Sequence, residues 1–232
     1  MAGRVPRSLI AAVLLAMLVA AGAVAAAGVL RYRAAEAAAR AATSEKAAPN
    51  EIDARGCLAE PCQVLAFTTV GGTSVELVAD NGARSGRLRV GGVNGQVIPA
   101  TVTDHDVLLT QDSLQCVSGG WSACLIRGRD KDDRVFGQLI VGRSGNWASR
   151  QLFVSDAGYL ALAEVAGNSS PEVLAAQYVC GDEPCTDKPV RVRVFDLQGN
   201  ATLCTTRNYP SLDKLPGYPA VQLNQPALGK CP

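Results

Sequence analysis

Beyond residue 50, the chain is dominated by short runs in which apolar and polar side chains alternate with a period of two. This alternation, together with many β-branched residues, is typical of β-strands. Turn signals such as Asn81-Gly82 and Ser144-Gly145-Asn146 separate the runs. The predicted strands are Gln63–Val70, Thr73–Val78, Arg87–Val90, Gln96–Val102, Val107–Gln115, Cys124–Arg127, Arg134–Val141, Arg150–Val154, Tyr159–Val165, Glu172–Val179, Val190–Asp196 and Ala201–Cys204. The pattern therefore predicts an all-β domain.

Two stretches of this domain have similar patterns, although their residues differ. Val75–Cys116 and Gly137–Cys180 each contain several predicted strands and end at a cysteine that begins a short turn. A period of roughly 60 residues made of alternating strands is typical of stacked or radial β architectures. We therefore expect antiparallel repeat sheets, arranged like the blades of a propeller or as a sandwich.

All eight cysteines lie beyond residue 56, and most of them form close pairs along the chain. They are Cys57, Cys62, Cys116, Cys124, Cys180, Cys185, Cys204 and Cys231. An even number in this arrangement is typical of disulfides formed in an oxidising compartment. The simplest pairing joins 57 with 62, 116 with 124 and 180 with 185, which leaves Cys204 for Cys231. The alternatives are a bond from Cys231 to Cys57 or Cys62, and zinc held by the thiolates of two C-x4-C pairs.

A turn of the type Asp-x-Gly precedes a strand, a C-x4-C turn and a further strand in one part of the chain. The residues concerned are Val154–Val165 and Glu172–Cys185, and Arg89–Cys124 has a weaker form of the same pattern. This combination resembles repeats of bacterial secreted proteins of the β-propeller type. The resemblance implies blades of antiparallel strands and brings no catalytic residues with it. Two complete repeats and a partial one are too few for a ring of at least four blades. The alternatives are repeats that span more than one sheet, an open or oligomer-completed propeller, or a sandwich.

The amino-terminal segment differs in character from the rest of the chain. Ser8–Leu30 contains no charged residue and, as a helix, is long enough to cross a hydrocarbon core about 30 Å thick. We favour a transmembrane signal anchor, with residues 1–7 in the cytoplasm and the alanine-rich residues 31–50 as a stalk. The alternative is a signal peptide that is cleaved after Ala23-Val24-Ala25 and leaves a secreted protein.

The remainder divides into a β-repeat domain, residues 51–207, and a proline-rich tail, residues 208–232. Both are expected outside the cell membrane, because they contain all eight cysteines and disulfides form in an oxidising compartment. Pro210, Pro216, Pro219 and Pro226 exclude a central strand from the tail. Its apolar side chains are too numerous for a solvated extension, so we expect the tail to pack on the domain, held by Cys204 and Cys231. These apolar residues are Leu212, Leu215, Tyr218, Val221, Leu223 and Leu228.

The charge of the domain limits the classes of partner. Of 22 basic and 21 acidic side chains, 6 and 2 lie in residues 1–50, which leaves 16 and 19, a net charge of −3, for residues 51–232. A mildly acidic domain has no global attraction for nucleic acid or for anionic lipid. Nucleic acid is therefore not an expected partner.

Three segments suggest chemistry, but two of them are better explained as turns and the third lacks the motif that its chemistry requires. Asp104-His105-Asp106 contains the single histidine of the chain. Because neighbouring residues of a strand point to opposite faces, these three side chains would not converge on one point, and the segment is better explained as a solvated turn. Asp130-Lys131-Asp132-Asp133 lacks the alternating oxygen ligands and the glycine of an EF-hand calcium loop. No Gly-Lys-Ser/Thr follows Gly91–Gly95, as a phosphate loop would require. We therefore predict no catalytic residue, no metal site and no cofactor.

Two tryptophans and two asparagines remain as candidate surface sites. Trp121 and Trp147 lie in predicted loops, where they would contact a sugar or a partner protein, although local packing is the simpler explanation. Asn168 and Asn200 each begin a glycosylation acceptor pattern, which matters only in a host that glycosylates.

These observations favour a membrane-anchored extracytoplasmic module that binds or scaffolds a protein or glycan of the cell envelope without catalysis. Oligomerisation would complete an otherwise open β ring. The alternative is an envelope hydrolase that works through carboxylates such as Asp104, Asp106 and Asp156 on a propeller-like fold. A hydrolase requires these carboxylates to meet in one concave site, and we expect them to be scattered.

Overall fold

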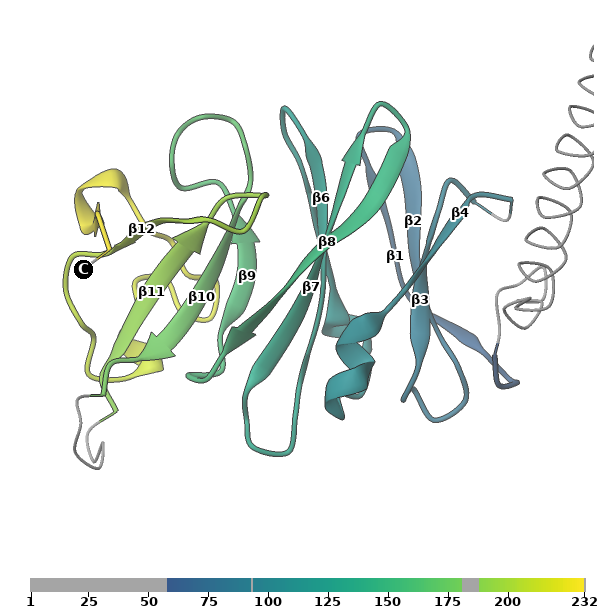
Figure 1. Cartoon of the computed structure of the whole chain (residues 1–232), viewed down its shortest axis with the longest axis horizontal. Coiled ribbons are helices and arrows are strands. Elements are labelled where there is room, and N and C mark those ends of the chain that lie inside the picture. The colour runs from purple at the N-terminus through teal and green to yellow at the C-terminus, as the bar shows by residue number, and fades with distance from the viewer. Residues whose placement is uncertain (1–57, 93, 181–187, 232) are drawn as a thin grey trace, which may run out of the picture. The chain divides into compact units, whose positions relative to one another are not determined.

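The computed structural model describes residues 58–92, 94–180 and 188–231, which form antiparallel β-sheets without any α-helix (Figure 1). Sheet 1 contains β1 (Gln63–Val70), β2 (Thr73–Ala79), β3 (Gly86–Val90) and β4 (Gln96–Pro99). Sheet 2 contains β5 (Leu114–Ser118), β6 (Ser122–Arg129), β7 (Val135–Arg143) and β8 (Asn146–Ser155). Sheet 3 contains β9 (Leu160–Ala163), β10 (Glu172–Tyr178), β11 (Val190–Phe195), β12 (Ala201–Thr205) and β13 (Leu228–Gly229). The prediction of an all-β fold with antiparallel sheets is confirmed.

Each sheet is a meander in which consecutive strands pair with each other. The extensive contacts between sheets join sheet 1 with sheet 2 and sheet 2 with sheet 3. The first strands of neighbouring sheets are in contact, β1 with β5 and β5 with β9. Over the described ranges, the three sheets therefore form an open series with sheet 2 in the middle, and they do not close a ring.

The sheets do not follow the repeat frame that the sequence suggests. Their first strands begin at residues 63, 114 and 160, whereas the two predicted repeats begin at Val75 and Gly137. Val75 lies in β2 and Gly137 lies in β7, so each predicted repeat covers parts of two neighbouring sheets. The turn closed by Cys116 and Cys124 does not mark the end of a sheet, because it joins β5 to β6 within sheet 2.

The predicted strand Val107–Gln115 is wrong for most of its length. Residues 107–110 are irregular, η2 (Gln111–Ser113) is a 3-10 turn, and β5 starts at Leu114. The backbone N–H of Thr110 donates to Ser113 Oγ at 2.9 Å, and the backbone N–H of Ser113 donates to the Thr110 carbonyl at 3.1 Å. Such local hydrogen bonds of short polar side chains compete with strand pairing and override the apolar character of this segment.

The segment after β4 also differs from the prediction. The predicted strand Gln96–Val102 ends at Pro99, and η1 (Thr101–His105) follows as a 3-10 helix. Thr103 Oγ1 donates to the carbonyl oxygen of Ala100 at 2.8 Å, which stabilises this turn locally.

The predicted membrane anchor, Ser8–Leu30, and the stalk, residues 31–50, lie outside the described residues. Within the described ranges, no helix is long and apolar enough to cross a membrane. All three sheets belong to one compact unit.

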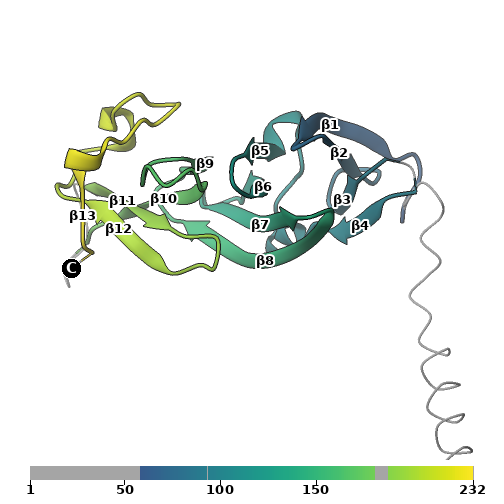
Figure 2. The same cartoon turned by 90° about the horizontal axis from the view of Figure 1, so that it is seen from above.

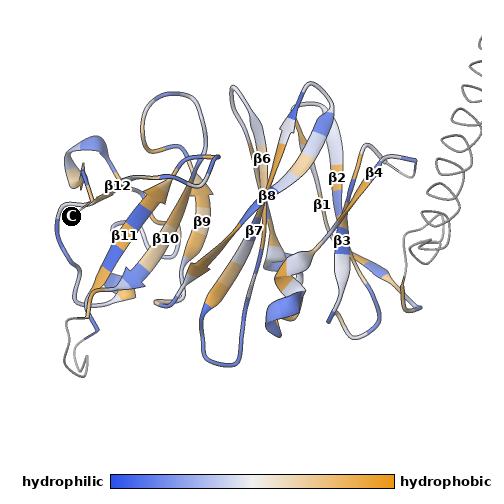
Figure 3. Cartoon of the chain, viewed as in Figure 1, coloured by the Kyte–Doolittle hydropathy of each residue, from blue (hydrophilic) through white to orange (hydrophobic). Residues whose placement is uncertain are grey.

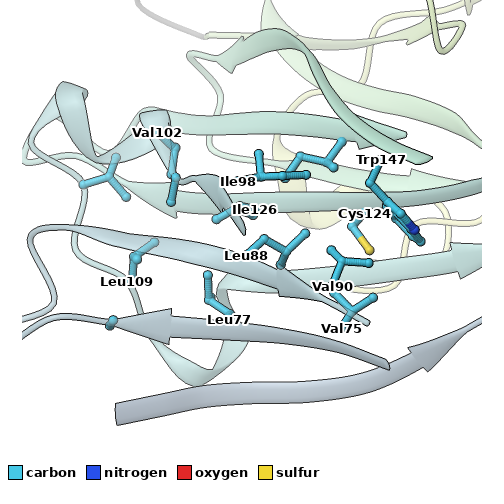
Figure 4. Packing of buried hydrophobic residues seen from close by; sticks show 14 of the residues in the cluster. Val75, Leu77, Leu88, Val90, Ile98, Val102, Leu109, Cys124, Ile126 and Trp147 are labelled. Atoms are coloured by element: carbon cyan, nitrogen blue, oxygen red, sulfur yellow. The ribbon is translucent and has the colours of Figure 1, made fainter. Parts of the chain in front are cut away.

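Sheet 2 is buried on both faces. Eight of the nine residues of β7 are buried, which explains its nearly continuous apolar sequence. Side chains of sheet 1 cover one face of sheet 2 together with the segment that connects the two sheets (Figure 4). Trp147 of β8 lies in this core with only 4% of its surface exposed. The labelled members of the cluster are Val75, Leu77, Leu88, Val90, Ile98, Val102, Leu109, Cys124, Ile126 and Trp147.

The other face of sheet 2 packs on sheet 3. Leu125 and Leu139 of sheet 2 contact a cluster that includes Leu160 and Val173 of sheet 3. The backbone of β7 comes close to sheet 3 at Gly137, where an added Cβ atom would lie 2.1 Å from a methyl carbon of Leu160. An added side chain would displace Leu160, so glycine at this position lets the Leu160 side chain pack directly on the backbone of β7.

The tail covers the outer face of sheet 3 (Figure 2). β11 alternates valine with arginine or phenylalanine, a pattern visible in Figure 3, and its three valines are buried against the tail. Leu215, Val221 and Leu223 of the tail have 3%, 6% and 8% of their surface exposed. Leu212 and Leu228 are partly buried in the same cluster, whereas Tyr218 is 42% exposed. The expected packing of the tail on the β domain is therefore seen.

Two disulfides lie wholly within the described residues, Cys116–Cys124 and Cys204–Cys231. Both pairs were predicted, Cys116–Cys124 from its close spacing and Cys204–Cys231 as the pair that local pairing leaves over. Cys62 and Cys180 are also in disulfides, and the residues expected to pair with them, Cys57 and Cys185, lie outside the described ranges. Cys204 belongs to β12, so its bond to Cys231 fastens the end of the tail to sheet 3.

We expect the double variant Cys204→Ser/Cys231→Ser to lose about 3.5 kcal/mol of unfolding free energy, because this bond closes a loop of 27 residues. The variant Cys116→Ser/Cys124→Ser is the matched control, and its shorter loop predicts a loss of about 2.5 kcal/mol. Denaturant unfolding of the full chain measures both values. A loss below about 1 kcal/mol in the first variant would show that the tail stays in place without its bond.

Candidate functional site

A groove lies where sheet 2 meets sheet 3, next to Trp121. It consists of two neighbouring cavities with volumes of about 430 and 170 Å³, both of which are lined by Trp121, Leu197 and Gln198. We call this site the Trp121 groove. Its other lining residues are Val141, Arg150, Gln151, Asn168, Ser170, Pro171, Glu172 and Asp196.

The position of Trp121 follows from the turn that carries it. Gly119, Gly120 and Trp121 connect β5 to β6, and the Cys116–Cys124 disulfide joins facing positions of the two strands. The backbone N–H of Gly120 donates to the carbonyl oxygen of Ser169 at 2.9 Å. This bond ties the turn of sheet 2 to the β9–β10 loop of sheet 3, so Trp121 is held between the two sheets.

The β9–β10 loop that bonds this turn is stabilised by hydrogen bonds of its own side chains. The backbone N–H of Ser169 donates to a carboxylate oxygen of Glu164 at 3.0 Å, and that of Ser170 donates to Asn168 Oδ1 at 2.9 Å. Glu172 is buried, and its carboxylate accepts a hydrogen bond from the backbone N–H of Val165 at 2.9 Å. The loop therefore forms a preorganised wall of the groove.

The opposite wall is the turn between β11 and β12. The carboxylate of Asp196 accepts hydrogen bonds from the backbone N–H groups of Gln198 and Asn200, at 2.9 and 2.8 Å, and from the side chain of Asn200. These bonds fix the turn and leave Gln198 exposed at its tip. The turn also lies against sheet 2, because an added Cβ atom at Gly199 would lie 1.8 Å from the side-chain oxygen of Gln151.

The chemical character of the groove is aromatic and polar. The ring of Trp121 is partly exposed, and the guanidinium of Arg143 lies over it at 4.6 Å from the ring centroid. At an exposed site such a contact is worth about 0.5–1 kcal/mol, so a ligand can displace the arginine at modest cost. Arg150, Gln151 and Gln198 add donors and acceptors. This arrangement offers stacking together with several hydrogen bonds.

Trp147, the other predicted candidate, has no access to a ligand. It is buried in the core between sheets 1 and 2, where its ring packs on Gly142. Its backbone N–H and carbonyl both bond the side chain of Gln96, at 3.2 and 2.6 Å. Local packing is therefore the correct explanation for Trp147, and Trp121 alone keeps the binding interpretation.

None of the carboxylates of the hydrolase hypothesis lines the Trp121 groove. Asp104 and Asp106 lie in and next to η1 beside His105, whose ring stacks on Phe136 at 4.5 Å. Asp156 follows β8 and accepts a hydrogen bond from the backbone N–H of Tyr178 at 2.9 Å. Among the described residues, no group of three histidine, cysteine, aspartate or glutamate side chains is placed to hold a metal ion.

The predicted turn at Asp130–Asp133 does connect two strands, β6 and β7. Asp130 accepts hydrogen bonds from the backbone N–H groups of Asp132 and Arg134, both at 2.9 Å, and pairs with the Arg134 side chain. Its carboxylate therefore shapes the turn, as Asp196 does in sheet 3.

No model of a known protein family matches the chain, and no curated protein or solved structure is significantly similar to it. What the protein binds therefore has to be inferred from its own residues. Sequence reasoning identified Trp121 but not Gln151 or Gln198. Their role depends on the packing of sheets 2 and 3, which no local pattern reports.

Replacement of Gly119 by alanine should displace Trp121. An added Cβ atom at Gly119 would lie 2.6 Å from the carbonyl oxygen of Ser169, so the turn has to move away from sheet 3. We expect a loss of about 1–3 kcal/mol in unfolding free energy and a shifted indole N–H signal of Trp121 in the NMR spectrum.

Gly120→Ala is the matched control for this substitution. An added Cβ atom there would lie 3.6 Å from the same oxygen, an ordinary contact distance. Equal effects of the two substitutions on the Trp121 signal would contradict the proposed docking of the turn on Ser169.

Proposed function

We propose that the protein is a membrane-anchored extracytoplasmic binding module whose Trp121 groove holds a glycan of the cell envelope. The observation that carries this proposal is the combination of a partly exposed tryptophan with amide and guanidinium groups in one preorganised groove. Sugar rings present apolar C–H faces that pack on an indole, and neighbouring hydroxyls that match such donors and acceptors.

The carboxylates of the groove favour binding over hydrolysis. Glycoside hydrolysis requires two carboxyl groups that face the scissile bond, one of them as an acid or nucleophile. Both acidic residues of the groove, Glu172 and Asp196, accept hydrogen bonds from backbone N–H groups of their own loops. These contacts give them a structural task and support a binding role for the site.

The location is part of the same proposal. Disulfides persist in oxidising compartments, and the Cys116–Cys124 bond closes the turn that carries Trp121. The uncharged segment Ser8–Leu30 would tether the domain to the outer face of the membrane. A tether would keep the groove close to the envelope polymers that surround the cell.

We further infer that the three sheets are blades of an open propeller-like array. Each sheet is an antiparallel meander, and the first strands of successive sheets contact each other, as inner strands of blades do. The tail would then act as the cap of the last blade, since it covers the outer face of sheet 3. Terminal caps of this kind are typical of repeat proteins.

The substitution Trp121→Ala should abolish most of the glycan affinity. We expect the full chain, solubilised in detergent, to co-sediment with purified peptidoglycan and Trp121→Ala to bind at least tenfold more weakly, equivalent to about 1.4 kcal/mol. Phe67→Ala is the control, because Phe67 is an exposed aromatic residue, 63% accessible, on β1 of sheet 1.

Three results would overturn this function. The first is unchanged co-sedimentation of Trp121→Ala, and the second is no co-sedimentation of the wild-type chain. The third is release of soluble sugar from the polymer that stops in Glu172→Gln or Asp196→Asn, which would support the hydrolase instead.

A further inference from the structure

A second cavity, of about 420 Å³, lies at the other end of β6 from Trp121. Trp121 immediately precedes this strand, whereas Arg127 and Arg129 are at its end. At about 3.4 Å per residue the two ends are roughly 25 Å apart, so the cavity is separate from the Trp121 groove. We call it the Arg127 pocket. The residues that matter below are Asp112, Arg127, Arg129, Tyr159, Tyr218 and Pro219, all of which line it.

Arg127 brings a half-buried positive charge to this pocket. Its Nη1 donates to the side-chain oxygen of Gln115 at 3.2 Å and to the carbonyl oxygen of Leu160. Burial lowers the pKa of Arg127 from its ordinary value, but a guanidinium stays charged at neutral pH. In the described part of the chain, no carboxylate lies within ion-pair distance of it. Asp112 stabilises the charge of Arg127 from a longer distance, but burial of a charge without a direct ion pair is still costly, and a bound anion would offset that cost.

Arg129 adds a second guanidinium on the same face, because residues two apart on a strand point in the same direction. It donates to the carbonyl oxygens of Asp133 and Gly158, at 2.7 and 3.1 Å, which hold it at the pocket. The carboxylate of Asp133 is 3.6 Å away and 87% exposed, so solvent screens this pair. Arg129 therefore keeps most of its charge available to a ligand.

The charge of the lining residues indicates the charge of the ligand. Two guanidinium groups and the carboxylate of Asp112 leave one net positive charge. A carboxylate ligand matches it, and arginine binds a carboxylate through two parallel hydrogen bonds. A phosphate ester carries about −1.5 to −2 charges at neutral pH and would leave excess negative charge beside Asp112.

Two tyrosines give the pocket a surface for a ring. The rings of Tyr159 and Tyr218 are tilted by 53°, with centroids 6.3 Å apart. The hydroxyl of Tyr159 accepts a hydrogen bond from the backbone N–H of Val221 at 3.2 Å, so its own proton remains for a ligand. Burial raises the pKa of Tyr159, which keeps the hydroxyl protonated and able to donate. Tyr218 is 42% exposed and lies at the pocket beside Pro219.

We propose that the Arg127 pocket binds an acidic sugar, a saccharide ring that carries one carboxylate. Arg127 and Arg129 hold the carboxylate, Tyr159 donates to a ring hydroxyl, and Tyr218 packs against the ring. The volume lies within the range of ligand sites, about 300–1,000 Å³. This site is independent of the Trp121 groove, so it adds a ligand class to the proposed function and does not rest on it.

The test compares three small probes on the full chain in detergent: glucuronate, glucose and glucose 6-phosphate. Calorimetric titration should give the highest affinity for glucuronate, with glucose at least tenfold weaker and glucose 6-phosphate weaker than glucuronate. Arg127→Gln should reduce the affinity for glucuronate at least tenfold. Arg84→Gln is the control, because Arg84 is exposed and lies between β2 and β3 of sheet 1.

Arg129→Gln provides a second variant, because Arg127 also supports Gln115 and Leu160 and its replacement risks misfolding. This variant should weaken glucuronate binding and should also lower its dependence on salt. Equal affinities for glucuronate and glucose, preference for the phosphate ester, or no binding of glucuronate would each overturn the proposal. Full affinity in folded Arg127→Gln or in Arg129→Gln would overturn it as well. Loss of peptidoglycan binding by Trp121→Ala has no bearing on these outcomes.

Discussion

The burial of both faces of sheet 2 is the constraint on which the rest of the structure depends. A sheet with two apolar faces needs a partner layer on each side, and sheets 1 and 3 provide these layers through two separate cores. Sheet 3 has an apolar outer face in turn, and the tail covers it. The short tail is thus the last layer that this stacking of apolar faces requires. The Cys204–Cys231 bond holds the tail on sheet 3 in a chain with few aromatic residues for its core.

The two candidate binding sites are consequences of the same packing. Sheets 2 and 3 meet closely at Gly137, in the interior of β7, and the two cavities lie at opposite ends of β6. Turns and loops of both sheets surround each cavity, so neither site exists in a single sheet. The loops around the Trp121 groove are stabilised by hydrogen bonds within each loop, whereas the Arg127 pocket is lined in part by Tyr218 and Pro219 of the tail. Correct docking of the tail is therefore a condition for the second site, and the tail also supports the β9–β10 loop of the first, because the side chain of Gln225 donates to the Ala166 carbonyl at 2.6 Å.

Local signals predicted most strands and the tail well, and they failed where competing local hydrogen bonds or long-range packing decide. Alternation found β1 and β11 to within a residue, and the apolar residues of the tail indicated its docking. Alternation failed at Val107–Gln115, where local hydrogen bonds of Thr110 and Ser113 replace strand pairing. Trp121 was found because tryptophan in a glycine-rich turn is conspicuous. Arg127 was missed because an arginine on a strand is common, and only the tertiary structure shows the residues that form a pocket around it.

The central claim is that the protein binds glycan where sheets 2 and 3 meet, beside Trp121. Hydrogen–deuterium exchange of the full chain, with and without soluble peptidoglycan fragments, tests this claim most directly. Binding in the groove should slow exchange in the β5–β6 turn, in the β9–β10 loop and in the β11–β12 turn, because these segments line it. Strands β1 to β4 should exchange as before. Protection confined to sheet 1, or no protection in the three turns at saturating fragment, would contradict the account.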